Sequence, residues 1–236
     1  PVNHMEGHIL STFISHSDKM NEFNSIKQVK FPAIALLISG GHTELVKVSS
    51  IGKYEVLGKT VDDAVGEAFD KVARMLGLPY PGGPEISKLA GIYRKKNVEN
   101  EFALPRPMLH SKDLNFSFSG LKTSVLYLLQ NLGEITENQR ENICMEFENA
   151  VTDVLIYKTR KAIEEICPQS LIIGGGVIAN AFIRNAFEKL VIEYSIPLLL
   201  PISGLTGDNA LMIALVGAIK PSVLSEGFKA EGNLGL

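Results

Sequence analysis

The sequence predicts an α/β protein, because short apolar runs typical of buried strands alternate with glycine loops and helical segments in its last third. The order of strand, loop and helix occurs twice, at 170–173, 174–176 and 179–190 and again at 197–200, 204–207 and 208–219. Ligands of α/β proteins bind at the carboxyl ends of strands. Both glycine loops are therefore candidate binding sites.

The first two thirds of the chain add a β-hairpin and a series of helices. The apolar run at 33–39 predicts a buried strand, and Gly40-Gly41 then turns the chain into a second strand. The other predicted elements are strands at 44–49 and 54–59 and helices at 4–13, 61–76, 84–96, 120–132 and 137–166. Predicted loops cover 15–30 and 97–118, and the tail after Gly227 is expected to be loose.

The composition is that of a soluble globular protein. The 236 residues are 45% hydrophobic and 21% charged, which is enough chain for one large domain or two small lobes. No apolar run reaches the length of a membrane-spanning helix, and the polar N-terminal segment is not a secretory signal. With two cysteines and no disulfide framework, a cytoplasmic location is expected.

The net charge of −3 counts against a nucleic-acid partner at the level of the whole molecule. Local basic clusters exist, such as Arg94-Lys95-Lys96. These clusters can bind the phosphates of a nucleic acid, or a partner protein can bind those phosphates instead. Alternatively, the clusters are solvated surface side chains.

Two histidines and a distant carboxylate are candidate metal ligands. His4 and His8 are four residues apart, so on a helix both imidazoles lie on one face and can hold one cation. Glu6 lies two residues from each histidine, which is not the zinc-protease pattern. The spacing also arises by chance. Asp208 either caps a helix or completes a site of two histidines and one carboxylate.

Two glycine turns are candidate ligand loops. Gly40-Gly41 allows backbone N–H groups to approach an anion, and a plain hairpin turn does not explain the polar residues Ser39 and His42 beside it. The three glycines at 174–176 leave room for a flat ring or a phosphate. Asn180 either caps the following helix or hydrogen-bonds a ligand.

An acidic helix face and a rigid corner form the last candidate. Asp63, Glu67 and Asp70 share one face of the predicted helix, where they bind hydroxyls or amines or are simply solvated. The proline–glycine corner at 80–84 demands a special backbone, which favours a site.

Taken in order, these segments resemble a known family. The matching motifs are HMEGH (4–8), LISGGHTEL (37–45), GEAFDKVARMLGLPYPGGP (66–84), NFSFSGLKTS (115–124), GGGVIAN (174–180) and TGDNALMIA (206–214). They look like the catalytic subunit of the tRNA N6-adenosine threonylcarbamoyltransferase family. The resemblance extends from His4 to about Ala214.

The resemblance implies the fold of actin, Hsp70 and sugar kinases, in which two ribonuclease-H-like lobes enclose a nucleotide. It implies transfer of threonylcarbamoyl from threonylcarbamoyl-AMP to N6 of adenosine 37 in tRNAs that read ANN codons. By resemblance, the metal ligands are His4, His8 and Asp208, for one divalent ion, Fe²⁺ first and Zn²⁺ second. The implied substrate-binding residues are Leu37, Ile38, Ser39, Gly40, Gly41, Asp70, Gly83 and Asn180, and His42 is assigned to proton handling or orientation.

Two departures from the family pattern are visible. The opening GIETSCDDT hairpin of the family is missing and the chain begins at Pro1, so a fragment is expected. Where many relatives have CTDNAAMIA, this chain has LTGDNALMIA, which keeps Asp208. The expected division is a remnant of the N-terminal lobe at 1–30, a C-terminal lobe at 31–220 with a helical insertion at about 61–140, and a tail at 221–236.

The implied partners are tRNA, threonylcarbamoyl-AMP or an adenine nucleotide, and proteins of the TsaB and TsaE type or of the KEOPS type. Two other functions stay open at this stage. One is a metallopeptidase, an old label of this family as a sialoglycoprotein endopeptidase. The other is a non-catalytic ATPase-like assembly module.

Overall fold

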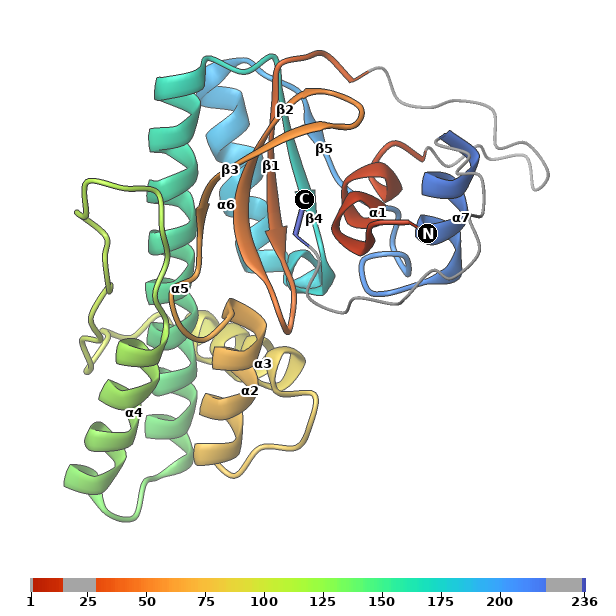
Figure 1. Cartoon of the computed structure of the whole chain (residues 1–236). Helices are drawn as coiled ribbons and strands as arrows, with labels where there is room; N and C mark the ends of the chain where they lie inside the picture. Colours follow the sequence, from red (N-terminus) through yellow and green to blue (C-terminus); the bar gives the residue numbers. More distant parts are fainter. Residues whose placement is uncertain (1, 15–28, 220–234) are drawn as a thin grey trace.

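The computed structural model describes residues 2–14, 29–219 and 235–236, and its centre is a mixed β-sheet (Figure 1). The strands lie in the order β3-β2-β1-β4-β5. Their bounds are Ala33–Ile38 (β1), Thr43–Ser50 (β2), Lys53–Lys59 (β3), Ser170–Gly174 (β4) and Leu198–Leu199 (β5). All five predicted strands are confirmed, with ends shifted by at most one residue.

The topology brings three loops to one edge of the sheet. Strand β1 is antiparallel to β2 but parallel to β4, and β4 is parallel to β5. The carboxyl ends of β1, β4 and β5 therefore point the same way. The turn after Ile38, the glycines after Ile173 and the loop that contains Asp208 all follow these ends. This is the edge at which α/β proteins bind ligands.

Helices cover both faces of the sheet, as the fully buried residues of β1 require. Helices α1 (His4–Ser11) and α7 (Ala210–Ile219) lie on one face, and α5 (Glu137–Ile166) and α6 (Ala181–Tyr194) lie on the other (Figure 1). Alternate residues of β1 enter the two cores: Leu37 packs with α1, whereas Leu36 packs with the helices of the opposite face.

Three further helices extend the structure below the sheet (Figure 1). They are α2 (Val65–Met75), α3 (Gly82–Lys96) and α4 (Ser119–Leu132), and all lie within the predicted helical insertion. Helix α5 has the predicted bounds, and a capping box of Thr136 and Gln139 begins it.

Four predicted helix starts are wrong by two to four residues for physical reasons. Helix α2 begins at Val65 rather than Val61, because the preceding Asp62 binds the start of α4 instead. Helix α3 begins at Gly82 rather than Pro84. The short 3-10 helix η1 (Gly176–Ala179) delays α6 to Ala181, and α7 begins at Ala210 rather than Asp208.

Most of the predicted loop at 15–30 and almost all of the tail after Gly227 lie outside the described residues. Among the helices that the structure describes, none combines the length and apolar character needed to cross a membrane. The division into an N-terminal remnant, a C-terminal lobe and a tail stays a prediction.

Candidate functional site

The three predicted metal ligands converge although they come from opposite ends of the chain. Nε2 of His4 lies 3.3 Å and Nε2 of His8 lies 3.1 Å from the same oxygen, Oδ1 of Asp208. One donor atom from each of the three lies within 4.8 Å of the others. Two imidazoles and one carboxylate form a set that binds transition metals and zinc.

The local structure holds this cluster in place. The side chain of Asn3 caps α1 by accepting from the N–H groups of Met5 and Glu6 at 2.9 and 3.1 Å. Glycine at position 7 lets α1 approach α7 closely, because a Cβ there would lie 3.3 Å from Cγ of Met212. A Cβ on Gly174 would lie 2.8 Å from the backbone oxygen of His8, so the end of β4 also requires glycine.

The residue next to Asp208 takes the capping role at the start of α7. Oδ1 of Asn209 accepts from the N–H of Met212 at 3.0 Å, so Asn209 caps α7. Of the two roles left open for Asp208, helix capping is thus performed by the following residue instead. The Asp208 side chain is 74% exposed and reaches the two histidines.

The electrostatics of the cluster favour metal binding. Burial lowers the pKa of His8 below its ordinary value, and the neighbouring His4 lowers it further, while Asp208 offsets part of the shift. A neutral imidazole has a free lone pair, which a metal requires. The His8 side chain is only 3% exposed, whereas that of His4 is 46% exposed, so the cluster has a buried wall and an open side.

A cavity of about 550 Å³ lies beside the same glycine loop. Its walls come from the turn after β1, from α2 and α3, and from η1 and the start of α6. The lining residues are Gly40, Gly66, Phe69, Asp70, Tyr80, Pro81, Gly83, Pro84, Ser87, Lys88, Gly176, Val177, Ala179, Asn180 and Ala181. Gly174 touches α1 and Gly176 lines the cavity, so the short segment from the end of β4 to the start of η1 connects the cavity to the three-donor cluster.

Close backbone approaches build the walls of this cavity. A Cβ on Gly66 would lie 2.7 Å from the backbone oxygen of Ser39, and the N–H of Gly66 donates to that oxygen at 3.2 Å. A Cβ on Gly82 would lie 2.4 Å from Cβ of Ala73. The N–H of Gly82 donates to Oδ1 of Asp70 at 2.7 Å, which ties the corner before α3 to α2.

Two of the polar wall residues, Asp70 and Asn180, line the cavity and also hold the backbone beside it. Asp70 uses Oδ1 for Gly82, and its other oxygen is engaged by none of the described residues. Asn180 caps α6, since its Oδ1 accepts from the N–H groups of Phe182 and Ile183 at 2.9 and 3.1 Å. Both residues line the cavity.

Gly40 and Gly83 also line the cavity, so the structure brings four of the eight predicted substrate-binding residues to it. Leu37 and Ile38 lie in β1 and are almost completely buried. In the turn that follows, the hydroxyl of Ser39 accepts from the N–H groups of Gly41 and His42 at 3.3 and 3.1 Å.

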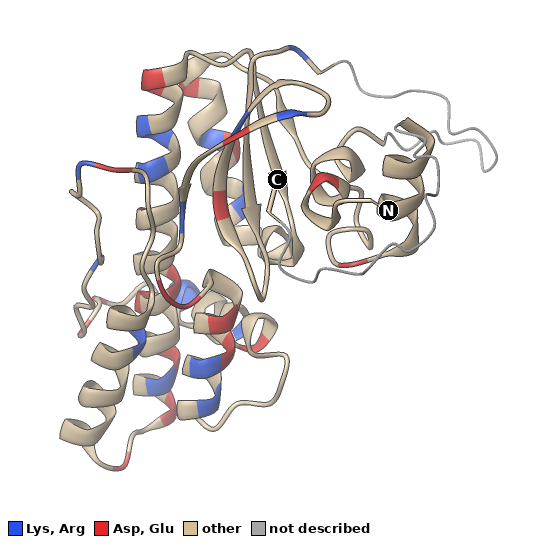
Figure 2. Ribbon diagram, viewed as in Figure 1, with Lys and Arg blue, Asp and Glu red and all other residues tan. Residues whose placement is uncertain are grey.

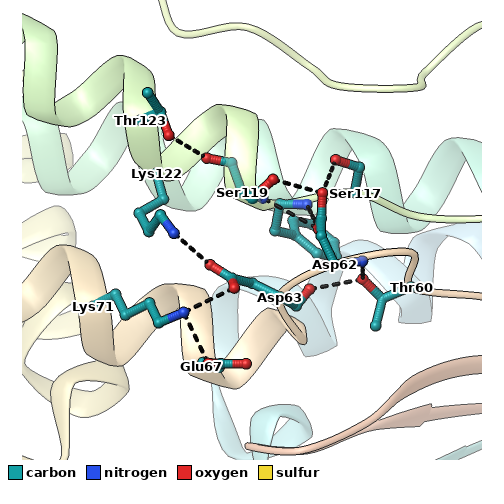
Figure 3. A network of polar contacts seen from close by, with 10 residues as sticks. Thr60, Asp62, Asp63, Glu67, Lys71, Ser117, Ser119, Lys122 and Thr123 are labelled. Atoms are coloured by element: carbon teal, nitrogen blue, oxygen red, sulfur yellow. Dashed lines mark hydrogen bonds and ion pairs between the residues drawn. The ribbon is translucent and has the colours of Figure 1, made fainter.

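The acidic face predicted from Asp63, Glu67 and Asp70 is not one continuous binding surface. Asp63 precedes α2, and its carboxylate accepts from Lys71 and Lys122 at 2.8 and 3.0 Å (Figure 3). Glu67 pairs with Lys71 at 2.8 Å. These two carboxylates are neutralised by lysines, and Asp70 alone of the three lines the cavity.

Several cavity residues were not predicted from the sequence. Tyr80, whose exposed fraction is 82%, and Phe69 belong to quoted motifs but were assigned no role. Ser87 and Lys88 lie further along α3, in a segment without any motif signal. Charge was no guide either, because acidic and basic residues are interleaved along α2 and α5, whereas α7 has neither (Figure 2). In α3 three basic residues gather in the last turn, at 94–96, and none of these lines the cavity.

The chain is therefore an α/β protein in which a three-donor cluster that could hold a metal ion lies beside a glycine-walled cavity. Residues 1–215 match the family model of tRNA N6-adenosine threonylcarbamoyltransferase. The chain belongs to this family.

Curated relatives carry the same name. The enzyme of Thermosipho africanus is 46% identical over 216 residues, a match that covers 92% of this chain and 61% of the relative. The enzyme of Chromobacterium violaceum is 44% identical over 93% of this chain and 62% of the relative. The chain thus spans about three fifths of their length. Among solved structures, component A of (R)-2-hydroxyglutaryl-CoA dehydratase from Acidaminococcus fermentans matches with a TM-score of 0.41 and 12% identity, covering 84% of this chain and 61% of that one.

Proposed function

We propose that this protein transfers the threonylcarbamoyl group from threonylcarbamoyl-AMP to N6 of adenosine 37 in tRNAs that read ANN codons. The observation that carries the proposal is the adjacency of two features. The loop at 174–176 contacts the backbone of His8 at one end and lines the cavity at the other. An acyl adenylate bound in the cavity would have its reactive end near the cluster of His4, His8 and Asp208.

The cavity suits the adenylate part of such a substrate. Glycine backbone at Gly40 and Gly176 leaves room for a phosphate or a flat ring. The second oxygen of Asp70 can accept from a ribose hydroxyl, and Asn180 lines the same cavity. In this proposal Ser39 and Gly41 support the phosphate-facing turn. Leu37 and Ile38 belong to the buried strand β1 that leads into this turn.

The residues present fit one divalent ion. His4, His8 and Asp208 would hold it, and we propose Fe²⁺, with Zn²⁺ as the other ion that this donor set accepts. When bound, such an ion supplies Lewis-acid polarisation of an oxygen at the reacting group. His42, which follows the turn at Gly40-Gly41, would orient the substrate or move a proton.

The remaining parts of the proposal concern partners and location. tRNA would be the acceptor substrate, and proteins of the TsaB and TsaE type or of the KEOPS type would be the partners. Because the net charge of the chain is −3, a partner protein is the expected source of much of the phosphate contact. We expect the protein in the cytoplasm, where its tRNA substrate is.

The test is a transfer assay on the full-length protein with its partners, threonylcarbamoyl-AMP and an unmodified tRNA transcript. Mass spectrometry of the digested tRNA should show threonylcarbamoyladenosine, and Asp208→Ala should abolish it. A protein that binds metal but neither binds AMP nor modifies tRNA would rule the proposal out. A peptide-hydrolysis assay should stay negative, because Glu6 is buried and its Oε1 accepts from the Tyr54 hydroxyl at 2.6 Å.

A further inference from the structure

A buried ion pair lies directly behind the cavity wall. Glu148 of α5 is completely buried, and its Oε2 accepts from Nη1 of Arg94 in α3. Its other oxygen, Oε1, accepts from Nδ2 of Asn180 at 2.6 Å. Glu148 therefore joins α3, which contributes several wall residues of the cavity, to Asn180, a wall residue from a different element.

The same group of side chains has further contacts that fix its geometry. The Arg94 guanidinium carbon lies 3.5 Å from the centroid of the Phe182 ring, in the first turn of α6. Its Nη2 donates to Oδ1 of Asn149 at 2.6 Å. Arg94 thus holds α3, α5 and α6 together. Gly83, Ser87 and Lys88 of the cavity wall lie on the same α3.

We infer that Glu148 and Arg94 are positioning residues, which fix the orientation of the Asn180 amide and so set the affinity of the cavity for its adenylate ligand. Neither residue lines the cavity. The inference rests on the proposed function, because it assumes that the ligand of the cavity is an adenylate.

The chemistry of the three groups requires a carboxylate at position 148. Oδ1 of Asn180 is occupied by the N–H groups of α6, so its amide nitrogen must face Glu148. Arg94 also presents only donors. An ionised carboxylate accepts on both sides, whereas a glutamine would direct its own N–H₂ at one of two donors. Buried ion pairs cost desolvation and contribute little net stability. We therefore assign this ion pair a role in fixing the geometry of Asn180 rather than in stabilising the fold.

A matched control lies on the same helix. Glu146 is 4% exposed and pairs with Arg106, and it accepts from Nδ2 of Asn100 at 2.6 Å and from the N–H of Leu104 at 3.1 Å. It has the same chemistry as Glu148 and is also buried. Its partners, however, hold the segment at 100–106, and none of them lines the cavity.

The experiment compares Glu148→Gln with Glu146→Gln by thermal unfolding and by calorimetric titration with AMP. Both variants should be less stable than the parent protein. AMP affinity should fall by about tenfold or more in Glu148→Gln, and it should stay unchanged in Glu146→Gln. Equal AMP affinities in the two variants would show that Glu148 is only structural and would overturn the inference.

A second readout separates this inference from the proposed function. The side-chain amide signals of Asn180, assigned by their loss in Asn180→Ala, can be followed by NMR without any ligand. They should shift and exchange faster with water in Glu148→Gln but not in Glu146→Gln. If the parent protein binds no AMP, the proposed ligand is wrong, and these signals still decide whether Glu148 orients Asn180.

An exchange of the two groups offers a rescue. In the double variant Glu148→Gln with Asn180→Asp, the glutamine N–H₂ faces a carboxylate and its oxygen faces Arg94, so every donor again meets an acceptor. Each single substitution should lower the melting temperature, and the double variant should recover most of the loss. Additive losses would contradict the proposed orientation.

Discussion

Nε2 of His8 lies 3.1 Å from Oδ1 of Asp208, although the two residues are at opposite ends of the described chain. Packing of α1 against α7 produces this contact, and the glycine at position 7 allows it. The spacing of His4 and His8 places two donors of the proposed metal site on one helix, and the fold brings the third donor, Asp208, to them. Loss of either the histidines or Asp208 should therefore abolish metal binding.

Replacement of His8 by alanine should remove metal binding. His8 contributes the buried donor of the cluster, and two remaining exposed donors bind a divalent ion weakly. We expect the iron or zinc retained after dialysis, measured by mass spectrometry of the metal, to fall by about tenfold or more. His110→Ala is the control, because His110 contacts Tyr157 instead. Metal retained by His8→Ala at the parent level would exclude the site.

Tyr54→Phe should loosen the helix that carries both histidines. The Tyr54 hydroxyl donates to Oε1 of the buried Glu6 at 2.6 Å and so ties α1 to β3. Burial raises the pKa of Tyr54, and its hydrogen bond to Glu6 adds to the shift, so the phenol stays protonated as a donor. We expect a loss of about 1–3 kcal/mol in urea unfolding together with weaker metal binding. Tyr127→Phe, at a side chain that is 60% exposed, should change neither.

Much of the fold was predictable because it depends on local sequence. Two elements are specified without help from distant residues. They are the strand formed by the apolar run at 33–38 and the long helix α5, which Thr136 caps. The predicted helix starts were wrong where a tertiary contact determines the first residue of the helix. The start of α3 depends on a hydrogen bond between Gly82 and Asp70, which no local pattern reveals.

The candidate site was predictable only in part, for a related reason. The glycine turns have a composition that marks them, whereas the apolar residues Leu37 and Ile38 of the same motif belong to the core. Asp208 and Asn209 are both good capping residues, and only the structure shows which of them caps. Glu148 gave no signal at all, because a glutamate on a long helix is usually exposed.

Asp62 should stabilise the protein in a pH-dependent way. Its carboxylate accepts from the hydroxyls of Ser117 and Ser119, both at 2.6 Å, and from the N–H of Phe118 at 2.9 Å, so it caps α4 from a distant part of the chain (Figure 3). Burial alone would raise the pKa of Asp62, but these hydrogen bonds outweigh it and lower the pKa.

A group whose pKa is lower in the folded state stabilises the protein above its unfolded pKa and loses that effect as the pH falls. Asp62→Ala should therefore cost about 1–2 kcal/mol at pH 7, and the difference from the parent should shrink below about pH 4. Urea unfolding at both pH values measures it. A difference that is constant with pH would mean that the carboxylate charge has no part in the cap.

Two adjacent glycines should respond very differently to alanine. Gly175 has a φ of +97°, and a Cβ there would lie 2.3 Å from the backbone oxygen of Ile38. A Cβ on Gly176 would meet no described atom within 4 Å, and this glycine lines the cavity. Gly175→Ala should therefore cost about 3 kcal/mol or more in unfolding free energy because β1 and β4 must separate. Gly176→Ala should keep the parent melting temperature and weaken AMP binding, since the methyl group enters the ligand space. If the two variants have the same melting temperature, the close approach of Gly175 to β1 is not what makes glycine necessary at this position.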